Sequence, residues 1–175
     1  MRSKKAKSKK RSATRESYAE QLKKAVFFVD RSSGKFELVN GLRNLGLSVE
    51  RHDDYFDENT QDPAWISACG QNNWIIVSSD KAIKRNTLLK LAIMSSGVAS
   101  FFFTSAEITS TQQVEAFSRA LPGITRMILG QPRPFIARIS QDGTVELWLN
   151  HKGEDVLARK LEIRKAKKLK KLQRN

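Results

Sequence analysis

The sequence contains a single cysteine and lacks any long apolar run. One thiol excludes an intramolecular disulfide and is typical of a reducing compartment, so we expect a cytoplasmic protein. Cys69 lies in the apolar stretch 65–69, which predicts a place in the core rather than a role as a nucleophile. No stretch approaches the roughly 18 apolar residues that a membrane span requires, so the sequence predicts no membrane partner.

Histidine is scarce as well, and the first residues lack an apolar segment. His52 and His151 are far apart and have no paired cysteines, which argues against a zinc site. His52 lies beside an acidic loop, so a general-base role stays open, although we leave both histidines out of the site. Residues 1–15 do not resemble a signal peptide, because no apolar stretch follows their charges.

Positive charge is concentrated at the two ends of the chain. Residues 1–15 and 159–175 each carry a formal net charge of +8, whereas the rest carries −2. The first segment predicts a disordered basic arm, and leucines at helical spacing among lysines predict a basic helical tail in the second. Such tails favour binding to polyanions, nucleic acid above all, without sequence specificity. An address signal or an anionic membrane surface is the alternative interpretation.

Apolar strand-like runs alternate with helix-like segments over the first two thirds of the chain. This order favours an α/β fold with a central, mainly parallel sheet, and the length between the tails suits one domain, 16–158. Two runs of alternating apolar residues flank Asp142-Gly143 and predict a β-hairpin over 134–149. The hairpin could form a sheet edge or a separate flap. The expected strands are 25–29, 47–52, 74–77 and 98–103, and the expected helices are 17–24, 36–45, 62–69, 88–93 and one from Thr111, broken near Pro122.

Three aspartates stand where strand-like and helix-like segments meet. Asp30 and Asp80 follow apolar strands, and Asp62 is expected to be the N-cap of a helix with proline in its first turn. Carboxylates gathered at the carboxyl ends of parallel strands would repel one another unless a cation lay between them, which indicates Mg²⁺ or Mn²⁺. Each aspartate could instead satisfy free backbone N–H groups as a cap.

Basic residues accompany these acids and are candidates for binding substrate phosphates: Arg31, Lys81, Lys84 and Arg85. They could equally balance the charge of neighbouring carboxylates. Ser78 and Ser79 could hydrogen-bond a metal-bound water, although serines at a strand end require no such role. A haloacid-type phosphatase needs a second aspartate two residues after the first, and Asp30-Arg31-Ser32 lacks it.

Four segments of the sequence, taken in order, resemble a known family. They are Phe28-Val29-Asp30-Arg31, the acidic loop around His52, Asp54 and Phe56, the helix start Asp62-x-x-Trp65-Ile66, and Trp74-Ile75-Ile76-Val77-Ser78-Ser79-Asp80-Lys81-x-Ile83. Together they resemble a PIN-like domain over about residues 25–105, most closely the shortened PIN-like proteins grouped with toxin ribonucleases of the VapC type. The hairpin at 134–149 is similar to an extension in some of those relatives.

The resemblance implies a three-layer fold and a metal-dependent endoribonuclease whose acidic cluster holds Mg²⁺ or Mn²⁺. Asp30, Asp62 and Asp80 match the family's catalytic and metal-binding acids. A fourth carboxylate is not clearly matched, and Glu37 or Glu107 could take that place. An antitoxin partner and a homodimer stay open. The alternative function is a non-catalytic nucleic-acid-binding protein that uses its basic tails.

Overall fold

One six-stranded sheet forms the centre of the protein. The computed structural model describes residues 20–33, 36–105, 107–153, 159, 161–163 and 165. The strand order is β2-β1-β3-β4-β5-β6, in which all neighbouring pairs are parallel except β5 and β6. The strands are β1 (Val26–Val29), β2 (Ser48–Arg51), β3 (Ile75–Ser78), β4 (Ala99–Phe103), β5 (Phe135–Ile139) and β6 (Val145–Asn150).

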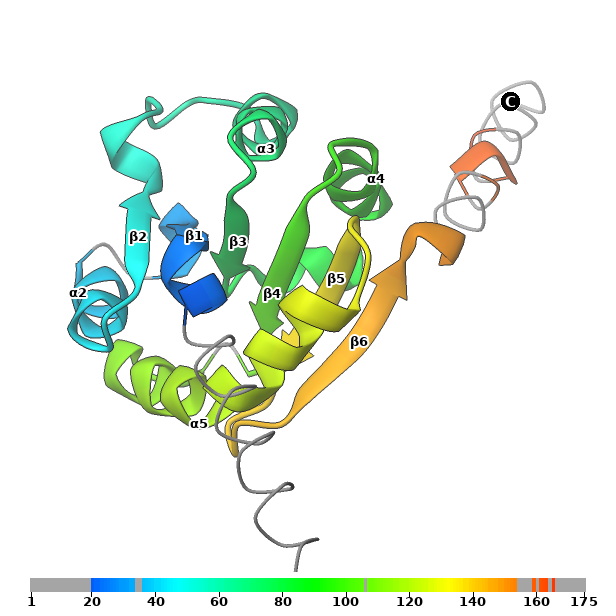
Figure 1. The fold of residues 1–175 in the computed structure, drawn as a ribbon. Helices are drawn as coiled ribbons and strands as arrows, with labels where there is room; N and C mark the ends of the chain where they lie inside the picture. Colours follow the sequence, from blue (N-terminus) through cyan, green and yellow to red (C-terminus); the bar gives the residue numbers. More distant parts are fainter. Residues whose placement is uncertain are drawn as a thin grey trace, which may run out of the picture.

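Helices cover both faces of the sheet and complete three layers (Figure 1). On one face, α2 and α5 bury Leu38, Leu42 and Phe117 against side chains of the strands. On the other face, α3 and α4 bury Trp65, Ile66 and Ile93. The α-helices are α2 (Glu37–Asn44), α3 (Asp62–Gln71), α4 (Thr87–Ser95) and α5 (Ser110–Gly130), and the 3₁₀ helices are η1 (Arg31–Ser33), η2 (His52–Asp54) and η3 (Lys81–Lys84).

The expected α/β architecture and its mainly parallel sheet are therefore confirmed. The hairpin is confirmed too, and it extends the sheet at the β5–β6 edge instead of forming a separate flap. Cys69 is fully buried, as expected for a core residue. Residues 20–24 are helical, whereas the arm 1–15 and most of the tail 159–175 lie outside the described residues.

Helix α5 differs from the expectation of a break near Pro122. It begins at Ser110 and runs unbroken to Gly130, with Thr109 as N-cap in a capping box with Gln112. Proline removes one backbone hydrogen bond and crowds the preceding turn. Phe117 and Ile124, one on each side of the proline, are both fully buried, so packing holds the helix together across it.

The strand order reverses direction beside β1. The chain leaves β1 through α2 to β2 on one side, and then returns through α3 to β3 on the other side of β1. Such a reversal opens a crevice at the carboxyl ends of the two strands, where open α/β sheets place their ligands. Asp30 follows β1 and Asp80 lies two residues after β3, so the fold brings both aspartates to this point.

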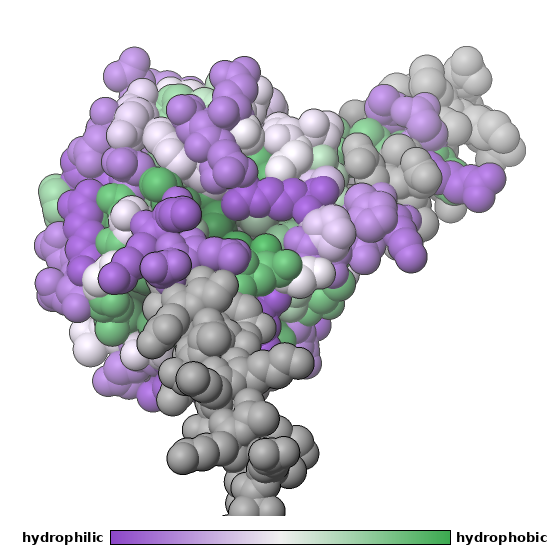
Figure 2. Space-filling model, in the orientation of Figure 1, coloured by the Kyte–Doolittle hydropathy of each residue, from purple (hydrophilic) through white to green (hydrophobic). Residues whose placement is uncertain are grey.

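Hydrophilic side chains cover much of the molecular face in Figure 2, and smaller hydrophobic areas lie scattered between them. Among the described residues, no helix is long and apolar enough to cross a membrane.

Candidate metal and nucleic-acid site

Asp30 is held by two serine hydroxyls at the end of β1. Ser78 Oγ and Ser32 Oγ each lie 2.7 Å from Asp30 Oδ2 and donate hydrogen bonds to it. Ser78 ends β3 and is 1% exposed, whereas Ser32 lies in η1, two residues after the aspartate. Hydrogen bonds to a carboxylate are stronger than neutral ones, so this pair fixes the orientation of Asp30.

A second serine pair fixes η1 against the end of β3. Ser79 donates from its backbone N–H to Ser33 Oγ at 2.7 Å, and its hydroxyl lies 3.2 Å from the same oxygen. Ser33 is 1% exposed. The backbone N–H of Asp30 also donates to Val77 O at 3.0 Å. The short segment after Asp30 is therefore tied to β3 by both backbone and side chains.

Asp80 is linked to Asp30 through Ser78. The backbone N–H of Asp80 donates to Ser78 Oγ at 3.0 Å, and Asp80 Oδ1 accepts from the backbone N–H of Ala82 at 2.7 Å. Burial raises the pKa of the Asp80 carboxyl; the Ala82 hydrogen bond opposes this rise, and the charges of Asp30 and Asp62 add to it. Asp80 therefore lies within electrostatic range of both other carboxylates.

Asp62 is the first residue of α3 and not its N-cap, which corrects the expectation from the sequence. Gln61 occupies the cap position and makes no side-chain cap bond. Asp62 Oδ1 instead accepts from Trp65 Nε1 at 3.2 Å. Trp65 stacks on Phe28 at 5.7 Å between ring centroids, so the start of α3 is positioned against β1.

The three aspartates do not form one compact ligand group. In the described part of the chain, no set of three or more His, Cys, Asp or Glu side chains is close enough to hold a metal ion. Asp62 is exposed, whereas Asp30 and Asp80 are half-buried. Repulsion between carboxylates favours this separation when no cation neutralises them.

The donor set nevertheless fits a hard divalent cation. Asp30 Oδ1 and Asp80 Oδ2 accept no hydrogen bond from the described residues, so one oxygen of each carboxylate stays available. Carboxylate oxygens with additional water ligands are what Mg²⁺ prefers. Asp30 and Asp80 would hold such an ion, and Asp62 would contact it directly or through water.

A basic groove adjoins Asp80 at the carboxyl ends of β3 and β4. Its volume is about 710 Å³, and it is lined by Lys81, Ala82, Lys84, Arg85, Thr104, Ser105 and Glu107. Three of the four predicted phosphate-binding residues therefore lie in one groove. Glu107, one candidate for the fourth carboxylate, lies there as well. Glu37, the other candidate, is exposed in the first turn of α2.

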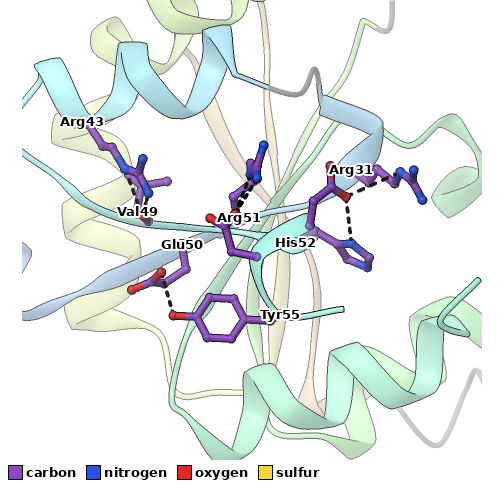
Figure 3. Close-up of polar contacts among 9 residues, drawn as sticks. Arg31, Arg43, Val49, Glu50, Arg51, His52 and Tyr55 are labelled. Atoms are coloured by element: carbon purple, nitrogen blue, oxygen red, sulfur yellow. Dashed lines mark hydrogen bonds and ion pairs between the residues drawn. The ribbon is translucent and has the colours of Figure 1, made fainter. Parts of the chain in front are cut away.

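Arg31, the fourth predicted phosphate-binding residue, lies elsewhere. Its guanidinium pairs with Glu58 Oε1 at 2.9 Å and lies 3.6 Å from Asp53 Oδ1. His52 Nδ1 lies 3.5 Å from the same Asp53 oxygen. In Figure 3, dashed lines join Arg31 and His52 to one shared carboxylate. Arg31 therefore balances the charge of the acidic loop, which was the alternative interpretation. His52 is 3% exposed and packs among Phe28, Phe56 and Trp65.

A second groove lies beside Asp80 and is rich in hydroxyl groups. Its volume is about 550 Å³, and it is lined by Ser32, Ser33, Ser79, Asp80, Lys81, Ile108, Thr109, Ser110 and Gln113. Gln113 is 6% exposed, and its Oε1 has no hydrogen-bond partner among the described residues. Lys81 lines both grooves, so it joins them beside Asp80.

Sequence reasoning missed Ser32, Ser33 and Gln113, and for Ser78 it offered a hydrogen bond to a metal-bound water and not the bonds to Asp30 and Asp80. The available signal was the spacing Asp30-x-Ser32, because serine two residues from an aspartate often bonds to it locally. Gln113 carried no signal, since it lies in a polar first turn of a helix and only the tertiary structure buries it.

The comparisons with known proteins agree with this geometry. A family model described as a PIN-like domain matches residues 25–105. The chain is also 27% identical over 113 residues to VapC45 of Mycobacterium tuberculosis, which is named as a ribonuclease; the match covers 62% of this chain and 81% of that protein. No solved structure matches significantly. The family match, the sheet and the paired aspartates at the reversal of strand order together indicate a PIN-like domain over residues 25–105.

Proposed function

We propose that the protein is a ribonuclease that hydrolyses RNA phosphodiester bonds with Mg²⁺ or Mn²⁺. One observation carries the proposal: Ser78 bridges Asp30 and Asp80 at the reversal of strand order. Each carboxylate keeps one oxygen available for a cation. The matches to a PIN-like domain and to a protein named as a ribonuclease support the same chemistry.

The protein's own residues orient the carboxylates that would hold the metal ion, and the bound ion would supply the chemistry. Ser32 and Ser78 hold Asp30 in one orientation, and Ala82 fixes Asp80. A bound divalent ion would polarise a phosphoryl oxygen and lower the pKa of water for in-line attack on phosphorus. Asp62, at the start of α3, would contact the ion directly or through water.

The basic groove supplies the contacts to substrate phosphates. Lys81, Lys84 and Arg85 line it, and Lys84 Nζ already donates to Thr104 O at 3.1 Å. An ammonium has three donors, so Lys84 can bind a phosphate without leaving this carbonyl. The tails 1–15 and 159–175 would add affinity that is independent of sequence.

The likeness to a VapC-named protein suggests that this ribonuclease is the toxin of a toxin–antitoxin pair. We therefore propose an antitoxin protein as a partner, and we propose that the chain acts in the cytoplasm and can form a homodimer. Co-expression with the product of a small adjoining reading frame, followed by co-purification, tests the antitoxin. Sedimentation of the purified chain tests the dimer.

The decisive experiment is RNA cleavage with and without a metal ion. Wild-type protein should cleave single-stranded RNA in Mg²⁺ or Mn²⁺, lose activity in excess EDTA and recover it when the ion is restored. Asp30→Asn in the same buffer is the control for contaminating nucleases. Cleavage that persists in EDTA would overturn the metal mechanism. Binding without cleavage under every condition would favour the non-catalytic alternative.

A further inference from the structure

Trp148 lies on the edge strand β6 with two cations over its ring. Lys90 Nζ from α4 is 4.5 Å from the ring centroid, and the Arg138 guanidinium carbon from β5 is 5.4 Å from it. The indole is only partly buried, at the margin of the core that α3 and α4 cover. Glu146 pairs with Arg138 at 3.1 Å, so one carboxylate accompanies the two cations.

A β-bulge places this tryptophan. Ala137 pairs with Leu147, whereas Ile136 pairs with Leu149, so Trp148 is an extra residue in β6. A bulge bends its strand and redirects side chains. Trp148 and Leu149 consequently both pack against the core under α3 and α4.

The tryptophan is connected to the basic groove through short contacts. Lys90 Nζ donates to Lys84 O at 3.0 Å, and Lys84 Nζ donates to Thr104 O at 3.1 Å. The backbone N–H of Thr104 donates to Ile139 O, one residue beyond Arg138. Cationic side chains therefore extend along the carboxyl ends of β3, β4 and β5, from the residue after Asp80 to Trp148.

We propose that Trp148, Lys90 and Arg138 form a base-stacking subsite for single-stranded RNA that extends from the basic groove. The proposal rests on the ribonuclease function, because the strand that stacks here is the one that enters the site. A base that stacks on the indole takes the place of a cation over the ring, and the displaced cation binds the adjacent phosphate. The cations favour a polyanion over an apolar protein segment at this surface.

RNA binding in EDTA tests the subsite without cleavage. Trp148→Leu removes the aromatic face, Trp148→Phe keeps one, and Leu147→Ala changes an exposed neighbour on β6 as a control. With a fluorescein-labelled RNA 12-mer, we expect about tenfold weaker binding for Trp148→Leu, and near-native binding for the other two variants. Binding to inorganic polyphosphate should be the same in all variants, because it has no bases.

Tryptophan fluorescence gives a second test that needs only the conservative variant. RNA should quench wild-type fluorescence, and Trp148→Phe should bind RNA with most of that quenching lost. Unchanged quenching, unchanged RNA affinity in Trp148→Leu, or equal losses for RNA and polyphosphate would overturn the proposal. A change in the oligomeric state of Trp148→Leu, measured by sedimentation, without a change in RNA affinity would also overturn the proposal. Trp148 would then belong to a protein contact.

Cleavage by the wild-type preparation in Mg²⁺ separates the two proposals. Base-dependent binding through Trp148 without cleavage would refute the proposed ribonuclease function and support the proposed stacking subsite. Cleavage with RNA affinity that is independent of Trp148 would retain the ribonuclease and refute the subsite.

Discussion

Replacing Ser78 with alanine should damage both stability and activity, because one buried hydroxyl joins the two aspartates. Ser78 is 1% exposed, and its Oγ donates to Asp30 Oδ2 at 2.7 Å and accepts from the Asp80 N–H at 3.0 Å. A hydrogen bond to a charged group contributes about 1.5–3 kcal/mol, and a neutral one about 0.5–1.5 kcal/mol. We therefore expect Ser78→Ala to lower the free energy of unfolding by about 2–4 kcal/mol, or several degrees in Tm.

Activity should fall further than this loss of stability explains. Without Ser78, Asp30 keeps only the Ser32 hydroxyl, and the backbone of Asp80 loses its link to β1. Removing a group that orients a metal ligand typically costs about 10-fold to 100-fold in metal affinity or activity. We expect a drop of that size in kcat/KM for RNA, measured well below the Tm of the variant and at several Mg²⁺ concentrations.

Ser100→Ala is the matched control. Ser100 is a fully buried strand serine whose hydroxyl donates to Phe135 O at 3.2 Å, away from the aspartates. Its replacement should cost about 1 kcal/mol and leave cleavage unchanged. If Ser78→Ala lost no more stability than Ser100→Ala and kept wild-type activity, the assignment of Ser78 as the link between Asp30 and Asp80 would be wrong.

Three further changes test other parts of the structure. Asp80→Asn should abolish cleavage in Mg²⁺. In chelator it should raise Tm relative to wild type by more at pH 7 than at about pH 3, because a raised carboxyl pKa destabilises the fold as that group ionises. Thermal denaturation at both pH values checks the sign. Deleting 1–15 and 159–175 should weaken RNA binding and flatten the dependence of log affinity on log salt, measured by anisotropy, with turnover at saturating RNA nearly unchanged. Gln113→Met should raise the free energy of unfolding by about 1 kcal/mol in urea denaturation, because it removes a buried oxygen that lacks a partner.

Each result has an outcome that contradicts it. A Tm difference between Asp80→Asn and wild type that does not depend on pH would show that ionisation of Asp80 does not destabilise the fold. An unchanged salt slope after deletion would move RNA binding from the tails to the body of the protein. A less stable Gln113→Met would mean that the amide contributes more through its 3.5 Å contact with Ile108 O than its unpaired oxygen costs.

The sequence by itself determined the α/β order, the hairpin and the places of Asp30 and Asp80. Apolar runs such as 74–77 are buried on both faces of a parallel sheet, and Asp-Gly favours a tight turn, so local patterns were sufficient there. Such local patterns did not predict the full extent of α5. Pro122 weakens a helix locally, and only burial on both sides of it keeps the helix continuous.

The tertiary structure alone decided which side chains meet. Strand order is set by how helices pack on the two faces, and it places β1 beside β3, which brings Ser78 to Asp30 across 48 positions of sequence. The same packing pairs Arg31 with Glu58 and leaves Lys81, Lys84 and Arg85 beside Asp80. Sequence records where charges fall along the chain, but their partners depend on distances in space, which the packed core sets.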